Sequence, residues 1–161
     1  MTIRLAENRD IPGLIALLYQ VGGVHHKIRP DIFRDRCIKY TPEELEALLR
    51  DARTPIFVAM DGEFVAGYCF CQHREYRDST ALTDRKELYI DDLCVDENCR
   101  GKGIAKTLYA HVTEYAKNCG CAFVTLNVWC GNDSAMAFYE KMGLTPRNIY
   151  METRLEDDHA D

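Results

Sequence analysis

Two glycines and two basic residues fall within five positions of the segment NCRGKGIA, residues 98–105. A β-rich run precedes this segment and a stretch with helical periodicity follows it, so free backbone N–H groups and the positive end of a helix should converge here. Gly101 and Gly103 allow the backbone to approach a ligand, and Arg100 and Lys102 add positive charge. The segment matches neither a Walker A loop nor the spacing G-x-G-x-x-G. The motif alone is compatible with a phosphate-binding turn and with an ordinary turn.

Three acidic residues lie on the β-rich run KELYIDDLCV, just before this turn. Strict alternation would place Glu87 and Asp91 on one face of the strand. Asp92 would then lie on the opposite face, unless a β-bulge changes the parity. Carboxylates in the middle of a sheet are costly unless they reach solvent or a cation. We therefore expect at least one of them to line a cleft.

The first part of the chain predicts one strand and two helices that support these segments. TIRLA is typical of a short strand, and NRDIPGLIALLYQV has the apolar spacing of a helix. The glycines and proline of GGVHHKIRPD predict a loop that contains His25 and His26. A second helix is predicted over TPEELEALLRDA, with Thr41 as its N-cap and Pro42 at its first position.

The second part predicts a hairpin, further strands and two helices. PIFVAM and EFVAGYCFCQH flank an Asp-Gly turn, which is a strong hairpin signal. A helix is expected over about residues 101–118, AFVTLNVW is a strand, and NDSAMAFYEKMG is a short helix capped by Asn132 or Asp133. LTPRNIYMETRLE is predicted as a last strand, with Pro146 restricting its start to an edge or a bulge. This order predicts a mixed α/β fold with one sheet and helices on both faces.

Composition and charge narrow the class of protein. The 161 residues, 47% hydrophobic and 29% charged, suit one domain over residues 1–161, with a loose acidic tail at 156–161. The sequence has no apolar run of ~20 residues and no signal-like start, so we expect a cytoplasmic protein without membrane contact. The formal net charge of −6 argues against a nucleic-acid partner. Eight cysteines without a C-x-x-C pair favour buried, reduced thiols, and we expect no metal.

Two segments resemble one known superfamily. VDENCRGKGIAKTLY resembles the acetyl-coenzyme A signature of the GNAT superfamily of N-acetyltransferases, (Gln/Arg)-x-x-Gly-x-(Gly/Ala), and GNDSAMAFYEKMGL resembles its second conserved segment. The resemblance covers about residues 2–155 in the order of elements. Asn98 stands where the family usually has Gln or Arg, which implies a weaker pyrophosphate contact. The family's fold implies a mostly antiparallel sheet whose central parallel pair of strands splays apart.

The resemblance implies that acetyl-coenzyme A is the co-substrate and where it binds. Its pantetheine arm would pair like a strand with the backbone near Cys94 and Val95. Asn132 belongs to the second cofactor-binding segment. The pyrophosphate would be held by the backbone N–H groups of the turn, namely Arg100, Gly101, Lys102, Gly103, Ile104 and Ala105.

The resemblance also implies catalytic roles. Tyr139 lies at the family's general-acid position, and a phenol with a pKa near ~10 suits a leaving thiolate whose thiol has a pKa of about 8.5. The alternative is that Tyr139 only packs. Asp91 and Asp92 match paired acids of the polyamine-acetylating branch, so either could contact the acceptor or act as the base, with a water relay as the alternative. No histidine lies near Cys94 in sequence, which argues against a cysteine nucleophile.

The function implied is transfer of an acetyl group from acetyl-coenzyme A to a primary amine of a small molecule or protein, by direct attack in a ternary complex. The paired acids predict a cationic acceptor. A non-catalytic acyl-coenzyme A sensor and a different mononucleotide binder are the alternatives. We also expect a homodimer, because the last strand can form an edge and family members often pair through this region.

Overall fold

The strands form where alternation and turn signals predict them, with one exception. The computed structural model describes residues 1–155, whose five strands form one sheet in the order β1-β2-β3-β4-β5. Neighbouring strands are antiparallel except β4 and β5, which run parallel. The mixed, mostly antiparallel sheet is therefore confirmed. The strands are β1 (Thr2–Leu5), β2 (Ile56–Asp61), β3 (Phe64–Tyr76), β4 (Arg85–Val95) and β5 (Phe123–Leu126).

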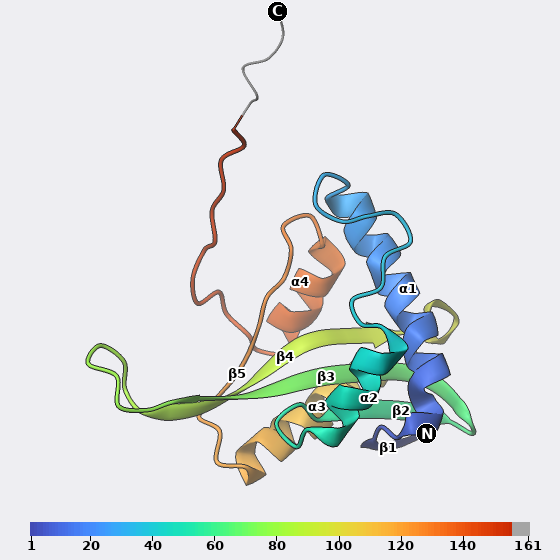
Figure 1. Cartoon of the computed structure of the whole chain (residues 1–161), viewed down its shortest axis with the longest axis horizontal. Coiled ribbons are helices and arrows are strands. Elements are labelled where there is room, and N and C mark those ends of the chain that lie inside the picture. Colours follow the sequence, from blue (N-terminus) through green and yellow to red (C-terminus); the bar gives the residue numbers. More distant parts are fainter. Residues whose placement is uncertain (156–161) are drawn as a thin grey trace, which may run out of the picture.

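Helices cover both faces of this sheet, as expected (Figure 1). α1 and α2 pack on one face and α3 packs on the other, while α4 follows β5. None of the helices within residues 1–155 has the length and apolarity needed to cross a membrane. The helices are α1 (Ile11–Ile28), α2 (Pro42–Arg50), α3 (Ile104–Asn118) and α4 (Asp133–Lys141), with short 3-10 helices η1 (Asn8–Asp10) and η2 (Glu97–Cys99).

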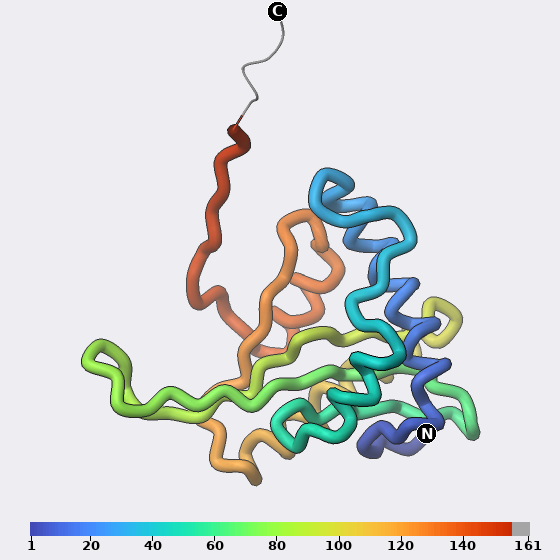
Figure 2. The backbone as a smooth tube through the Cα atoms, viewed as in Figure 1, coloured from blue at the N-terminus to red at the C-terminus, as the bar shows by residue number. Residues whose placement is uncertain are grey.

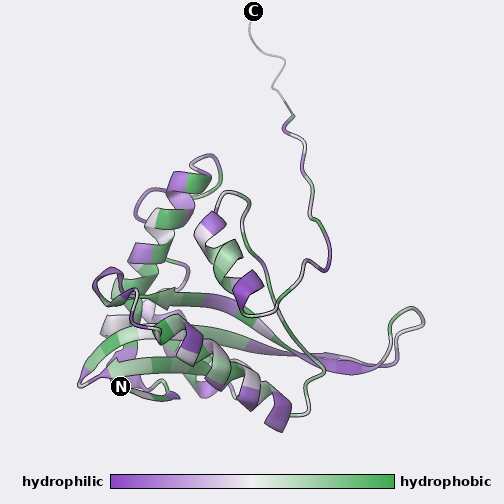
Figure 3. Ribbon diagram, turned by 180° about the vertical axis from the view of Figure 1, so that it is seen from behind, coloured by the Kyte–Doolittle hydropathy of each residue, from purple (hydrophilic) through white to green (hydrophobic). Residues whose placement is uncertain are grey.

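Each face of the sheet has its own apolar core. On one face, Ile90 of β4 packs in a buried cluster with Leu108 of α3. On the other face, Tyr68 of β3 is buried together with Leu14 of α1 and Leu45 of α2. The two cores hold the middle of β3 and β4 firmly between helices. Figure 3 shows hydrophilic residues at the far ends of these two strands, where the hairpin projects beyond the helices.

The first helix is longer than predicted. The glycines of GGVHHKIRPD do not end α1, which continues to Ile28, so His25 and His26 lie in its last turns rather than in a loop. Gly22 serves packing instead, because a Cβ there would lie 2.1 Å from the backbone oxygen of Cys37. The segment that returns along α1 therefore approaches it closely at this glycine.

The predicted last strand is wrong. Residues 145–155 form no strand, and Figure 2 shows this segment running away from the sheet. Its side chains explain why it is only tethered: Arg147 pairs with Glu87 at 2.8 Å, whereas Ile149, Tyr150 and Met151 are 83–99% exposed. The segment has apolar side chains but nothing within residues 1–155 to pack them against. The acidic tail expected at 156–161 lies outside the described residues.

Candidate active site

A β-bulge in β4 brings two carboxylates to one face of the sheet. Phe70 of β3 pairs with Asp92, but the next residue, Cys71, pairs with Ile90, so Asp91 is the extra residue of the bulge. Asp91 receives a hydrogen bond from Tyr40, which is stacked on Phe70. Both carboxylates therefore lie on the α1–α2 side. The strict alternation that would separate Asp91 from Asp92 is broken here.

Asp91 is held by two residues of the segment between α1 and α2. The Tyr40 hydroxyl donates to Asp91 Oδ2 at 2.6 Å, and the ammonium nitrogen of Lys39 lies 2.8 Å from Asp91 Oδ1. The Lys39 ammonium also donates to the backbone carbonyl of Asp91 at 3.0 Å. The Asp91 side chain is only 10% exposed. This carboxylate is thus fixed in place and paired with a cation.

Asp92 has a different hydrogen-bond partner. The hydroxyl of Tyr68 donates to its Oδ2 at 2.8 Å. Burial raises the pKa of Asp92 from 3.8 to about 6, against the opposing effects of the Tyr68 hydrogen bond and the Lys39 charge. A carboxyl group with this pKa exchanges its proton near neutral pH, which suits a general base.

The parallel pair of strands separates beside these carboxylates. β4 and β5 pair only from Glu87 opposite Phe123 to Ile90 opposite Leu126. The last part of β4, including Cys94 and Val95, therefore has no β5 partner along that side. Such an unpaired backbone can accept a strand-like ligand.

The thiol of Cys94 is not available as a nucleophile. It is buried, and burial raises its pKa to about 12, so it stays protonated near neutral pH. The thiol donates to the backbone carbonyl of Leu17 at 3.7 Å. The predicted pairing with the pantetheine arm therefore involves only the backbone of Cys94.

The glycine turn holds two residues in the left-handed conformation. Gly101 and Gly103 have φ values of 77° and 78°, which L side chains rarely adopt, and a Cβ on either would meet open space. No side chain within residues 1–155 caps the first turn of α3, which starts at Ile104. The backbone N–H groups of this turn are free to meet an anion. The predicted residues Arg100 and Lys102 are exposed beside it.

Tyr139 lies on α4 and packs against α3. Its ring lies edge-on to that of Tyr109 on α3, with centroids 6.4 Å apart. Burial raises its pKa, and the negative charge of Asp92 raises it further. The phenol is thus protonated at neutral pH and close to the buried carboxylate. The predicted Asn132 caps α4, where its side chain accepts a hydrogen bond from Ala135 N–H at 3.3 Å.

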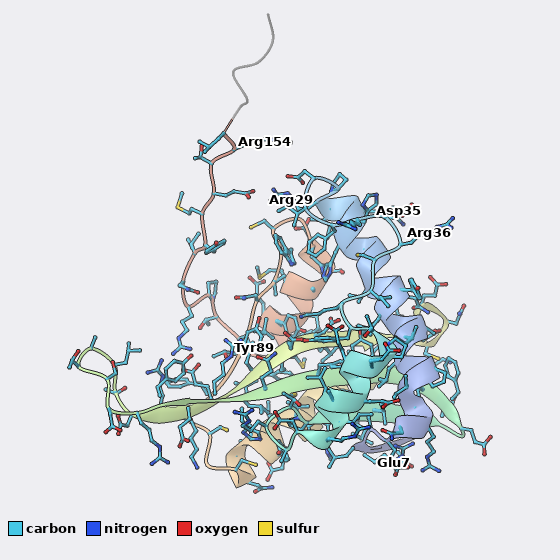
Figure 4. The ribbon with its side chains drawn as sticks, viewed as in Figure 1. Glu7, Arg29, Asp35, Arg36, Tyr89 and Arg154 are labelled. Atoms are coloured by element: carbon cyan, nitrogen blue, oxygen red, sulfur yellow. The ribbon has the colours of Figure 1, made fainter. Side chains whose placement is uncertain are left out.

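A cluster of aromatic side chains lies near Lys39. Phe33 stacks on His25 of α1 and meets the edge of Trp129, with ring centroids 4.9 and 5.0 Å apart. Burial lowers the pKa of His25, and the positive charge of Lys39 lowers it further, so Lys39 lies near this cluster. Figure 4 labels Tyr89 on β4 and, farther from the sheet, Arg29 at the C-terminal end of α1.

Three residues of the site were not predicted to act there. These are Lys39, Tyr40 and Tyr68, none of which lies in a motif that the sequence analysis singles out. The available signal was that a buried tyrosine in an apolar strand needs a partner for its hydroxyl, and the adjacent strand offers two carboxylates.

The cysteines are closer to the prediction of buried, reduced thiols: four are buried, and all eight have free thiols. Among residues 1–155, no group of three metal-ligating side chains is placed to hold a metal ion.

Comparison with known proteins identifies the family. Residues 23–144 match the acetyltransferase (GNAT) family. The chain is 29% identical to a streptothricin acetyltransferase of Streptomyces lavendulae over 68% of this chain and 56% of that protein. It is 32% identical to N-alpha-acetyltransferase 30 of Schizosaccharomyces pombe over 54% of this chain and 55% of that protein. The chain thus spans about half the length of these curated relatives.

A solved structure matches over nearly the whole length. The crystal structure of a mutant BH1408 protein from Bacillus halodurans has a TM-score of 0.93 and 31% sequence identity, covering 97% of this chain and all of that one. The matched family region contains the bulge, the glycine turn and Tyr139. With the splayed pair β4–β5 and the glycine turn already in place, the chain belongs to the acetyltransferase (GNAT) family.

Proposed function

We propose that the protein transfers an acetyl group from acetyl-coenzyme A to a primary amine that carries positive charge. The observation that carries this proposal is the β4 bulge, which presents Asp91 and Asp92 on one face beside the point where β4 and β5 separate. A binding protein for acyl-coenzyme A has no need of two acidic groups there. The proposed enzyme needs one to attract the amine and one to accept a proton.

Acetyl-coenzyme A is the co-substrate of this family, and the residues present fit it. The uncapped turn with Gly101 and Gly103 suits the pyrophosphate, since its N–H groups and the end of α3 favour an anion. The unpaired side of β4 near Cys94 and Val95 suits the amide groups of the pantetheine arm. When bound, the group supplies the activated thioester.

The chain's own residues would then divide the remaining work. Asp91 binds the acceptor's cationic group, and Asp92, directly or through a water molecule, takes a proton from the attacking amine. The amine nitrogen forms a bond to the thioester carbon, and the bond to sulfur breaks. Tyr139 donates its proton or a hydrogen bond to the departing thiolate. The nucleophile is the acceptor itself, in a ternary complex.

A shared fold does not fix the acceptor, so the acceptor is identified by a screen. The relatives are named as a streptothricin acetyltransferase and an N-alpha-acetyltransferase, so the test includes both small-molecule amines and peptides. The test is a screen for thiol release from acetyl-coenzyme A against polyamines, aminoglycosides, amino acids and peptides. Thiol release that depends on one or more cationic amines supports the proposal. Binding of acetyl-coenzyme A with no release by any amine would favour a sensor instead.

We further propose that the protein forms a homodimer in the cytoplasm. The exposed apolar side chains of the C-terminal segment, Ile149, Tyr150 and Met151, would be covered by a second copy of the chain. Eight free thiols suit a reducing compartment.

A further inference from the structure

The ammonium group of Lys39 contacts Asp91 in two ways that a substrate amine could copy. Its nitrogen lies 2.8 Å from Asp91 Oδ1 and donates to the Asp91 backbone carbonyl at 3.0 Å. The Lys39 side chain is 43% exposed, whereas that of Asp91 is 10% exposed. The carboxylate is therefore part of the site, and the ammonium group reaches it from the solvent side on a long, flexible chain.

The surroundings allow Lys39 to leave without disturbing Asp91. Tyr40 holds the other carboxylate oxygen, Oδ2, at 2.6 Å, so the orientation of Asp91 does not depend on Lys39. Lys39 lies in residues 29–41, which contain no helix or strand. An exposed lysine head loses little when it returns to water.

We propose that Lys39 occupies the place of the acceptor's ammonium group in the resting protein, and that a cationic acceptor displaces it from Asp91. This inference rests on the proposed function. Asp91 and Asp92 lie side by side and need a cation, so exchanging one ammonium group for another keeps the charge balanced. A neutral acceptor that took the place of Lys39 would leave the Asp91 carboxylate without a cation. Lys39 is thus a specificity-determining residue that selects cations and competes with them.

Two substitutions at Lys39 should shift acceptor affinity in opposite directions. Lys39→Met keeps the aliphatic stem but removes the competitor, so we expect the Kd of 1,4-diaminobutane, measured by calorimetry, to fall about two- to fivefold. Lys39→Arg offers a guanidinium that pairs more firmly with a carboxylate, so the Kd should rise. Lys27→Met, at an exposed position of α1, is the matched control and should change little.

A labelling experiment reads the displacement itself. Butylguanidinium is a cation that reductive methylation does not modify, and its presence should speed the methylation of Lys39 but not that of Lys27, as followed by peptide mass spectrometry. The inference is overturned if Lys39→Met binds 1,4-diaminobutane no more tightly than the wild type, or if neither binds it. It is also overturned if bound butylguanidinium leaves the labelling of Lys39 unchanged. None of these results would change the outcome of the thiol-release screen, so the proposed function is tested separately.

Discussion

The hydroxyl of Tyr68 on β3, a residue buried beneath α1 and α2, donates a 2.8 Å hydrogen bond to the carboxylate of Asp92 on β4. This bond satisfies the hydroxyl of Tyr68, a polar group in an otherwise apolar core. The hydrogen bond does not fully offset the free-energy cost of burying the charged Asp92 carboxylate, because the pKa of Asp92 is still raised to about 6. Asp92 therefore has a cost in stability that a purely structural residue would not have.

Asp92→Asn should make the protein more stable and less active. Unfolded, Asp92 ionises near its ordinary pKa of 3.8, whereas in the folded protein it ionises near 6. The folded state binds the proton more tightly, so stability falls as pH rises between these values, and the full cost remains above pH 6. The shift corresponds to roughly 3 kcal/mol, and partial exposure reduces the gain to roughly 1–3 kcal/mol.

Urea unfolding of wild type and Asp92→Asn should then differ little at pH 4 and most at pH 8. The activity of the wild type should rise with pH through about 6, as Asp92 loses its proton. A variant that is destabilised at both pH values would show that Asp92 is a structural residue.

Tyr139→Phe should lower kcat by about 10²–10⁴-fold, because it keeps the ring but removes the proton donor. Affinity for acetyl-coenzyme A and thermal stability should be nearly unchanged. Tyr109→Phe is the matched control, since Tyr109 is a neighbouring tyrosine whose pKa is also raised by burial. If Tyr139→Phe turns over within about threefold of wild type, less than roughly 0.7 kcal/mol, Tyr139 only packs.

Gly103→Asp should abolish binding of acetyl-coenzyme A, because it places a negative charge against the pyrophosphate. Gly62→Asp is a close control: Gly62 also has a positive φ, 61° against 78°, and a Cβ there also meets open space. Both variants should lose similar stability through backbone strain, about 1–2 kcal/mol. Calorimetry should detect cofactor binding only for Gly62→Asp, and equal binding by both variants would refute the role of the turn.

The proposed dimer depends on the exposed C-terminal segment. Sedimentation at micromolar concentration should give twice the chain mass of 18.5 kDa. Replacing Ile149 and Met151 by Asp should yield monomers, since both side chains are at least 83% exposed in the single chain. A wild-type protein that sediments as one 18.5 kDa species would remove the proposal.

Local signals in the sequence predict most of the fold. The hairpin at Asp61-Gly62, the Thr41 cap and the glycine turn are each specified within a few residues, and all form where expected. Two errors arise where a distant partner decides the outcome. The glycine at position 22 contacts Cys37 rather than ending α1. The segment after Pro146 has β-rich residues but no adjacent strand to pair with within residues 1–155.

The arrangement of the site is harder to predict than its residues. Asp91, Asp92 and Tyr139 can each be chosen from the sequence, but the bulge that sets Asp91 beside Asp92 depends on the register of β3 against β4. Strict alternation of side chains along β4 would wrongly place Asp91 on the opposite face from Asp92. Tyr40 and Lys39 reach the site from a segment without regular structure, for which sequence patterns give no position.

The central claim, acetyl transfer to a cationic amine, is tested most directly by identifying the product. Purified protein and acetyl-coenzyme A are mixed with each amine of the panel and with its hydroxyl counterpart, and products are quantified by mass spectrometry. We predict an N-acetylated product from one or more cationic amines, formed in step with free coenzyme A, and none from the hydroxyl compounds. Release of coenzyme A without any acetylated amine, or equal acetylation of the hydroxyl compounds, would contradict the account.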